Sequence, residues 1–302
     1  MNFKSESFRC EQEAPLERVL KEHFVGASWN EVRRLVDTGK IQVDGQLLTD
    51  KRRVIAAGSS VALSMTAPRK AAQGPSHEQN ILFVDPHLVV VNKPAGLAAV
   101  DHEQESTSLQ SELLTTLERM ERRSLAPLLV VHRIDKVTSG VMLFARTREV
   151  QLALKEQFRA HTTGRHYTAL AHGEVRPGTV RFRLVRDRGD GIRGVAQAAN
   201  QGREAVTHIT VIEPLARCTL IQCRLETGRT HQIRIHLAAT GHPLVGDAVY
   251  TRGYVGTLIS SPRTLLHAAY LSFAHPVLGQ QKDFSAPLPQ AFREILERER
   301  NR

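Results

Sequence analysis

The residues best suited to chemistry lie in a short polar segment between two apolar runs. His132, Arg133 and Asp135 follow the apolar residues 128–131, and residues 140–145 are apolar again. This pattern predicts a loop between two strands, a position in which proteins often place catalytic side chains. An ionised carboxylate such as that of Asp135, with a cation on either side, is suited to act as a nucleophile. The alternative for Asp135 is a structural role as a turn cap.

A second group of candidates comprises Arg229, Ile233 and Arg234. We expect Thr230 to cap a helix in this segment, and the helix to end at Gly241. Basic residues at the start of a helix oppose its macrodipole, and an anionic partner would offset that cost. The two histidines of the segment are five residues apart and do not share a helical face, so the spacing does not predict a metal site.

Tyr167 lies between these groups, in the segment 164–170, which predicts a strand. A tyrosine in a strand is more often part of the core than of a catalytic site. Further upstream, residues 89–97 predict a strand that ends in a Pro-Gly turn, and we do not count Lys93 as catalytic. Seven arginines interspersed with glycines lie in residues 176–203, a pattern typical of either a charged hairpin or a flap that grips phosphates.

The composition restricts the class of protein. The chain has 302 residues, a formal net charge of +10 and a pI near 9.9, which indicates a polyanionic partner such as a nucleic acid. Aromatic residues make up only 5% of the chain, which argues against base stacking as the main mode of binding. No apolar run is long enough to span a membrane, and the N-terminus does not resemble a secretory signal. We therefore expect a cytoplasmic protein.

Local patterns also predict the elements that position these candidates. Residues 15–23 and 29–36 carry apolar side chains at helical spacing, with Ser28 as a cap for the second helix. Residues 38–45 predict a strand that runs into an Asp-Gly turn. The segment that starts at Thr147 predicts a helix capped by that residue. The expected organisation is a small domain over residues 1–66, a flexible linker over residues 67–80, and a large domain over residues 81–302.

The three candidate segments together resemble the RluA-type RNA pseudouridine synthases. The residues from His132 to Gly140 resemble the family's H-R-L-D-x-x-T-S-G motif, with Ile134 in place of Leu. The segment around Tyr167 resembles the K-x-Y-x-A motif, with Arg165 in place of Lys. Residues 228–236 resemble the G-R-T-H-Q-I-R-x-H motif. The small N-terminal domain resembles the alpha-L RNA-binding domain that is often fused to such enzymes.

The resemblance implies an α+β fold, with a mostly antiparallel mixed sheet in the catalytic domain and a small α/β RNA-binding module before it. It implies that Asp135 is the nucleophile, that Tyr167 stacks on the target uracil and that Arg234 pairs with Asp135. Ile233 would pack beside the uracil, and Arg133 would fill the space that the flipped base leaves. The expected substrate-binding residues are Arg133, Ile233, His132 and Arg229.

The expected reaction is the isomerisation of selected uridines to pseudouridine in structured RNA, ribosomal or transfer, by a monomer without cofactor or metal. The residues do not separate attack of Asp135 on the sugar from attack on the pyrimidine. Two other classes of protein share some of these features. One is a non-catalytic RNA-binding or ribosome-assembly factor, and the other is a basic hydrolase that uses Asp135 with a nearby histidine.

Overall fold

The chain forms two compact units, Met1–Pro75 and Ser76–Arg302. The structure is a computed structural model that describes residues 3–37, 39–48, 50–51, 53–65, 77–101 and 107–302. Residues 67–76 of the expected linker lie outside the described residues. Residues 77–80 were also assigned to the linker, but they pack on the larger unit, where His77 is buried and its Nε2 lies 2.6 Å from the Glu112 carboxylate. The described part of the larger unit therefore begins a few residues earlier than the sequence predicted.

The smaller unit combines two helices with short antiparallel strands around its own apolar core. Ser28 caps the second helix as predicted: the Glu31 amide donates to the Ser28 hydroxyl, and the Glu31 carboxylate accepts from the Ser28 amide. Among the described residues the main sheet has the order β1-β6-β3-β4, and β2 pairs with β5. The elements are β1 (Glu6–Arg9), β2 (Ala14–Pro15), α1 (Leu16–His23), α2 (Trp29–Asp37), β3 (Ile41–Val43), β4 (Gln46–Leu47), β5 (Val54–Ile55) and β6 (Ser60–Leu63).

The larger unit is built on one mixed sheet, which has eleven strands among the described residues. Its order is β13-β12-β14-β15-β11-β16-β10-β8-β7, with β9 beside β10 and β17 beside β16. The strands are β7 (Ile81–Val84), β8 (Leu88–Lys93), β9 (Leu129–Val130), β10 (Ser139–Ala145), β11 (Gly164–His172), β12 (Gly178–Val185), β13 (Gly194–Val195), β14 (Arg203–Pro214), β15 (Cys218–Leu225), β16 (Leu266–Ala274) and β17 (Gln281–Ser285).

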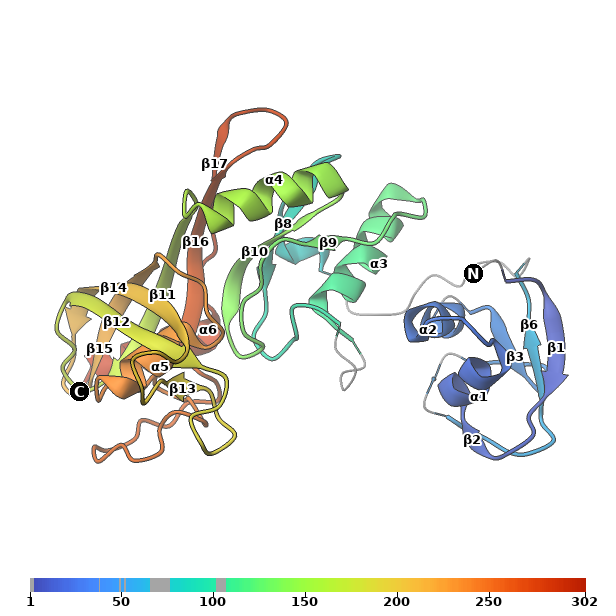
Figure 1. Cartoon of the computed structure of the whole chain (residues 1–302), viewed down its shortest axis with the longest axis horizontal. Coiled ribbons are helices and arrows are strands. Elements are labelled where there is room, and N and C mark those ends of the chain that lie inside the picture. Colours follow the sequence, from blue (N-terminus) through green and yellow to red (C-terminus); the bar gives the residue numbers. More distant parts are fainter. Residues whose placement is uncertain (1–2, 38, 49, 52, 66–76, 102–106) are drawn as a thin grey trace. The chain divides into compact units, whose positions relative to one another are not determined.

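Helices cover both faces of this sheet. At the β8–β10 end, Val89 and Val91 pack against α3, whereas their neighbours Leu88 and Val90 pack against α4, because successive side chains of a strand point to opposite faces. Figure 1 shows α3 and α4 on the two sides of β8 and β10. The helical elements are η1 (Glu78–Asn80), α3 (Leu109–Glu121), α4 (Arg148–Arg159), α5 (Gln232–Ala239) and α6 (Gln290–Arg300).

The same alternation places α5 and α6 at the other end of the sheet. Ala169 and Ala171 of β11 pack in one cluster with residues of α5, whereas Leu170 packs with α6 on the opposite face. Tyr167 contacts both the α3 cluster and the α5 cluster. It therefore lies between these two helices, on the face of the sheet that they share.

A close approach of two strands explains the glycine of the Thr-Ser-Gly segment. Strand β10 runs parallel to β16 where Ser139 pairs with His267 and Gly140 with Ala268, whereas the other strand pairs of the described sheet are antiparallel. Gly140 has a φ of +116°, and a Cβ there would lie 2.2 Å from the Ala268 carbonyl oxygen.

The mostly antiparallel mixed sheet and the α+β class were both predicted correctly.

Candidate active site

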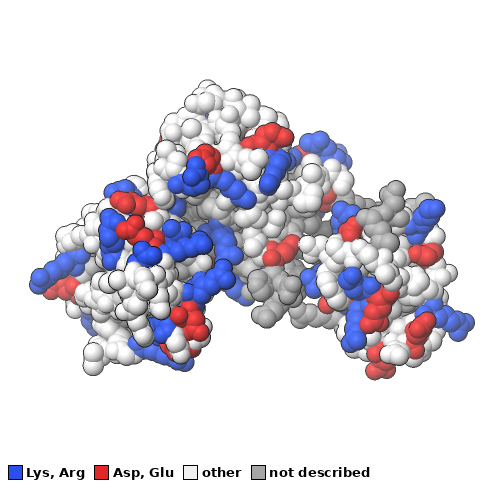
Figure 2. All heavy atoms as spheres, in the orientation of Figure 1, with Lys and Arg blue, Asp and Glu red and all other residues white. Residues whose placement is uncertain are grey.

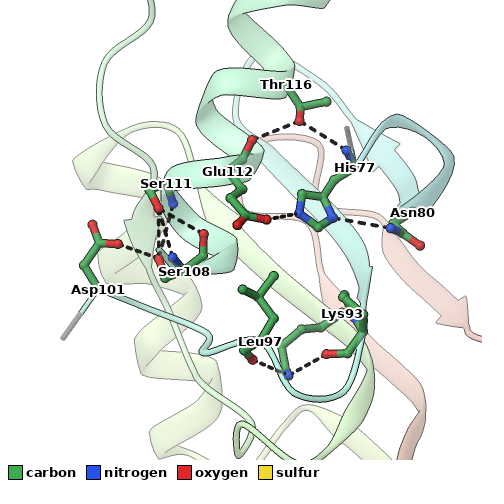
Figure 3. Close-up of polar contacts among 10 residues, drawn as sticks. His77, Asn80, Lys93, Leu97, Asp101, Ser108, Ser111, Glu112 and Thr116 are labelled. Atoms are coloured by element: carbon green, nitrogen blue, oxygen red, sulfur yellow. Dashed lines mark hydrogen bonds and ion pairs between the residues drawn. The ribbon is translucent and has the colours of Figure 1, made fainter. Parts of the chain in front are cut away.

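A buried lysine fastens the loop that carries Asp135. This loop connects β9 to β10, the two strands that the sequence predicted, and the structure pairs them with each other. Lys93, at the end of β8, is fully buried, and its Nζ donates to the carbonyl oxygens of Pro94, Leu97 and Lys136 at 2.7–3.1 Å. Figure 3 shows the contacts of Lys93 within its own turn. The bond to the residue after Asp135 ties the position of the nucleophile candidate to the central sheet.

Arg234 faces Asp135, as expected, but its main partner is another carboxylate. Its Nη1 lies 3.8 Å from Asp135 Oδ2. Its Nε and Nη2 donate to Asp247 Oδ2 and Oδ1 at 2.6 and 2.9 Å, and Asp247 is buried. Burial alone would raise the pKa of Asp247, but the hydrogen bonds and charge of Arg234 outweigh it and lower that pKa below its usual value. Asp247 thus holds the guanidinium with one edge turned toward Asp135.

Two aromatic rings complete the support of Arg234. The guanidinium lies over the Tyr250 ring, 5.0 Å from its centroid, and Tyr250 Oη lies 2.9 Å from His231 Nδ1. His231 has a φ of +59°, a conformation that non-glycine residues rarely adopt. Burial lowers the pKa of His231 below its usual value, although the negative charge of Asp135 acts to raise it. Asp247, Tyr250 and His231 were not predicted as functional residues.

Asp135 and Tyr167 line one cavity of about 640 Å³. The Asp135 side chain is 21% exposed. Burial raises the pKa of Tyr167 to about 12, so that its phenol is protonated at neutral pH. Ile233, at the start of α5, forms part of the apolar wall. The cavity also contains every other predicted site residue except Arg234: His132, Arg133 and Arg229.

His132 lies in the cavity wall as a neutral ring. It stacks on Phe158 of α4 with centroids 4.6 Å apart, and its Nε2 accepts a hydrogen bond from the Leu143 amide at 3.2 Å. Burial, together with the charge of Arg165, lowers the pKa of His132 to about 3. These contacts fix the ring against the sheet, and an acceptor role for Nε2 places the proton of the neutral ring on Nδ1.

The start of α5 differs from the prediction. Thr230 does not cap this helix: α5 begins at Gln232, its N-cap is His231 without a side-chain cap bond, and it ends at Ala239 rather than at Gly241. The Gln232 side chain turns back instead. Its Oε1 accepts from the Arg229 amide and the Thr227 hydroxyl at 3.0 and 2.7 Å. This contact fixes the loop that presents Arg229 to the cavity.

Basic side chains surround the cavity. Its lining includes the arginines Arg133, Arg159, Arg165 and Arg229, with Asp135 as its acidic residue. Figure 2 shows Lys and Arg side chains gathered on the larger unit around the region between α5 and β10. Nearby, the arginine-rich segment forms the hairpin of β12 and β13. Arg188 bonds to Asp190 within the hairpin, Arg181 to Glu204 of β14, and Arg183 to the loop before β14.

No helix among the described residues is long and apolar enough to cross a membrane. In the same part of the chain, no three His, Cys, Asp or Glu side chains are grouped so that they could hold a metal ion.

Comparisons with known proteins agree on one family. The RNA pseudouridylate synthase family matches residues 87–239. Ribosomal large subunit pseudouridine synthase D of Zymomonas mobilis is 35% identical over 91% of this chain and 90% of its own length. An uncharacterized RNA pseudouridine synthase of Bacillus subtilis is 35% identical over 78% of each chain. The solved structure of human RNA pseudouridylate synthase domain containing 4 has a TM-score of 0.63 and 25% identity, over 74% of this chain and 94% of that one. The chain belongs to the RNA pseudouridylate synthase family.

Proposed function

We propose that this RNA pseudouridine synthase acts on uridines of large-subunit ribosomal RNA, with Asp135 as its nucleophile. The observation that carries the catalytic assignment is the proximity of three residues from distant segments: Asp135 and Tyr167 line one cavity, and Arg234 Nη1 lies 3.8 Å from the Asp135 carboxylate behind it. The ribosomal substrate is supported by the names of relatives that span most of the chain, such as the enzyme of Zymomonas mobilis.

The reaction exchanges one bond of the nucleotide for another. The bond from ribose C1′ to uracil N1 breaks, the base turns, and a bond from C1′ to C5 forms. The C5 proton is lost and N1 gains a proton, so the overall change is an isomerisation without oxidation or reduction. In the proposal, Asp135 supplies the electron pair that forms a temporary covalent bond with the nucleotide.

Arg234 is a positioning group in this scheme. Its Nη1 lies 3.8 Å from the Asp135 carboxylate, so it stabilises the charge of the nucleophile before attack and orients one oxygen. Asp247 compensates part of the guanidinium charge and fixes its plane. This arrangement is preorganised, because the guanidinium needs no further movement when the nucleotide arrives.

Tyr167 and Ile233 bound the space for the uracil. The Tyr167 ring offers a stacking surface, and Ile233, which belongs to the cluster that Tyr167 packs against, offers an apolar contact. The Tyr167 hydroxyl has no hydrogen-bond partner among the residues that the structure describes, so that it is available to the nucleotide. Its position near Asp135 suits a role in proton removal from C5, once the base has turned.

The target base must leave its stack to reach this cavity. Arg133 is exposed at the cavity rim, and we propose that it occupies the space the base vacates. Arg229 and the surrounding arginines would contact the RNA backbone, which supplies affinity without sequence readout. His132, held neutral against Phe158, would provide a wall rather than a charge.

The smaller unit is part of the same proposal as an RNA-binding module. Trp29 is 44% exposed at the start of α2, and the Arg33 guanidinium lies 5.7 Å from the centroid of its ring. A cation and an exposed aromatic ring together suit contacts with RNA. We further propose that the enzyme acts as a monomer in the cytoplasm. The alternative of a non-catalytic RNA-binding factor has less support, since it gives the convergent cavity no purpose.

The substrate assignment is tested by incubating the protein separately with unmodified large-subunit ribosomal RNA, small-subunit ribosomal RNA and transfer RNA. Carbodiimide labelling followed by primer extension maps the modified uridines in each. We expect one or a few modified sites in the large-subunit RNA alone. Modification confined to transfer RNA would refute the ribosomal assignment and leave the catalytic one intact.

A further inference from the structure

Two buried polar atoms of the active-site cavity have no hydrogen-bond partner among the described residues. They are Oγ1 of Thr138 and Nε of Arg165. The two residues are 1% and 8% exposed. Both residues line the cavity that contains Asp135 and Tyr167. Buried polar groups in native proteins nearly always have a partner, so two unpaired groups in one cavity indicate a partner that arrives with the substrate.

The Arg165 guanidinium is fixed at one end only. Its Nη2 donates to the carbonyl oxygens of Leu225 and Glu226 at 3.4 and 2.7 Å, and the guanidinium lies over the Phe158 ring, 5.5 Å from its centroid. Neither Nε nor Nη1 donates to any group in the part of the chain that the structure describes, and no carboxylate there forms an ion pair with Arg165. Burial lowers the pKa of Arg165 below its usual value.

The fold leaves room for this unpaired cation. Arg165 stands two residues before Tyr167 on β11, and both side chains line the cavity. A Cβ at Gly228 would lie 2.9 Å from Arg165 Nη1, so a side chain there would crowd the guanidinium. A buried charge without an opposite charge is costly, and a fold selected only for stability would have neutralised or removed it.

We propose that Arg165 and Thr138 hydrogen-bond oxygen atoms of the target nucleotide after it has entered the cavity. This inference rests on the proposed function and identifies two further substrate-binding residues for it. Arg165 has only donors, so that its partner must be an acceptor: either a phosphodiester oxygen or a uracil carbonyl oxygen. The Thr138 hydroxyl can donate or accept, and it lies three residues after Asp135, on the same loop.

The test compares Arg165→Met and Arg165→Lys with the wild-type enzyme on an RNA that the wild type modifies. A lost hydrogen bond to a charged group lowers kcat/KM of Arg165→Met by roughly 10- to 100-fold. Arg165→Lys keeps the charge but not the planar fork, and it is expected to retain more activity than Arg165→Met. Arg224→Met is the matched control, because Arg224 pairs in register with His166 and lies on the opposite face of the sheet; it should behave as the wild type.

Binding to two RNAs identifies the acceptor. If Arg165 contacts the phosphodiester, Arg165→Met weakens binding both to the intact RNA and to an RNA that lacks the target base. If it contacts the uracil, Arg165→Met weakens binding to the intact RNA alone. Both outcomes support the proposal. Wild-type kcat/KM and wild-type RNA affinity in a folded Arg165→Met enzyme would overturn the proposal. It would also be overturned if kcat/KM fell equally in Arg165→Met and Arg165→Lys, in proportion to the decrease in melting temperature of each variant.

Thr138→Val tests the second contact with little change of shape. It removes the unpaired hydroxyl, so the melting temperature should stay the same or rise while kcat/KM falls by roughly 10-fold. An unchanged kcat/KM would remove Thr138 from the proposal. If the wild-type enzyme modified no RNA, the proposed function itself would be refuted. Failure of the proposed function is thus distinguished from failure of the proposal for Arg165 and Thr138.

Discussion

The Asp247→Asn substitution should damage both stability and turnover, because Asp247 is the buried partner of Arg234. One oxygen of the Asp247 carboxylate, Oδ1, accepts hydrogen bonds from Arg234 Nη2 and from the amides of Val249 and Tyr250 at 2.9–3.1 Å. An asparagine oxygen in that position preserves all three contacts. The amide nitrogen then replaces Oδ2 and faces Arg234 Nε, so that two donors oppose each other at the place of the 2.6 Å bond.

The cost follows from the burial of both partners. Removal of one partner from a buried ion pair destabilises a protein by about 3–5 kcal/mol. For a unit of roughly 200 residues, each kcal/mol lowers the melting temperature by about 2–4 °C, so we expect a decrease on the order of 10 °C. A displacement of Arg234 by about 1 Å at the nucleophile should lower kcat by roughly 100-fold.

The assay measures single-turnover pseudouridine formation at a temperature at which the variant is folded, with melting followed by circular dichroism. Glu299→Gln is the matched control: Glu299 is also buried and binds Arg217 through two oxygens, but it lies on α6, away from the cavity. It should lose stability while retaining turnover. Wild-type turnover in Asp247→Asn would refute the idea that Asp247 positions Arg234 for catalysis.

Three further predictions concern single side chains. Arg234→Ala should lower kcat by about 100- to 1000-fold with little change in RNA affinity, as measured by single-turnover assay and filter binding, because it removes the charge beside Asp135; normal turnover would exclude the ion pair from the mechanism. Tyr167→Phe keeps the stacking ring but removes the hydroxyl, so RNA affinity should persist while turnover falls by about 100-fold or more, and a fully active variant would limit Tyr167 to stacking. His236 is fully buried, neither ring nitrogen has a partner in the described part of the chain, and burial lowers its pKa to about 4. Between pH 6.5 and 4 the unfolded state therefore takes up a proton that the folded state refuses, and the free energy of unfolding falls by up to about 1.4 kcal/mol per pH unit from this residue. The free energy of unfolding in urea should therefore differ less between pH 7 and pH 5 for His236→Phe than for the wild type. An equal difference in the two proteins would show that His236 does not contribute to this pH dependence.

Local patterns were sufficient to predict the elements that flank the active site. The apolar runs around Asp135 form β9 and β10, and Thr147 caps α4 through its side chain. The Asp-Gly turn connects β3 and β4, with Asp44 and Gly45 both at positive φ. These features depend on residues that are close in sequence, and their physical causes are periodicity, capping and turn geometry.

The supports of the site were not predictable in the same way. Asp247 lies 13 residues after Arg234, and only the folded chain brings the two together. From the sequence, we do not count Lys93 as catalytic. The residues around Lys93 also do not indicate that its buried amine donates to three carbonyl oxygens. The N-terminal end of α5 also differed, because the Gln232 side chain takes part in tertiary contacts with β14 and with the preceding loop. In each case long-range packing decides the partner, and spacing along the chain does not report it.

The most direct test of the central claim is pseudouridine formation by Asp135→Asn on an RNA that the wild-type enzyme modifies. The substitution keeps the size of the side chain and removes the nucleophilic carboxylate, which is 21% exposed in the cavity and lies 3.8 Å from Arg234 Nη1. We predict a folded protein that binds the RNA as the wild type does and forms no detectable pseudouridine. Turnover at the wild-type rate would contradict the assignment of Asp135 as the nucleophile.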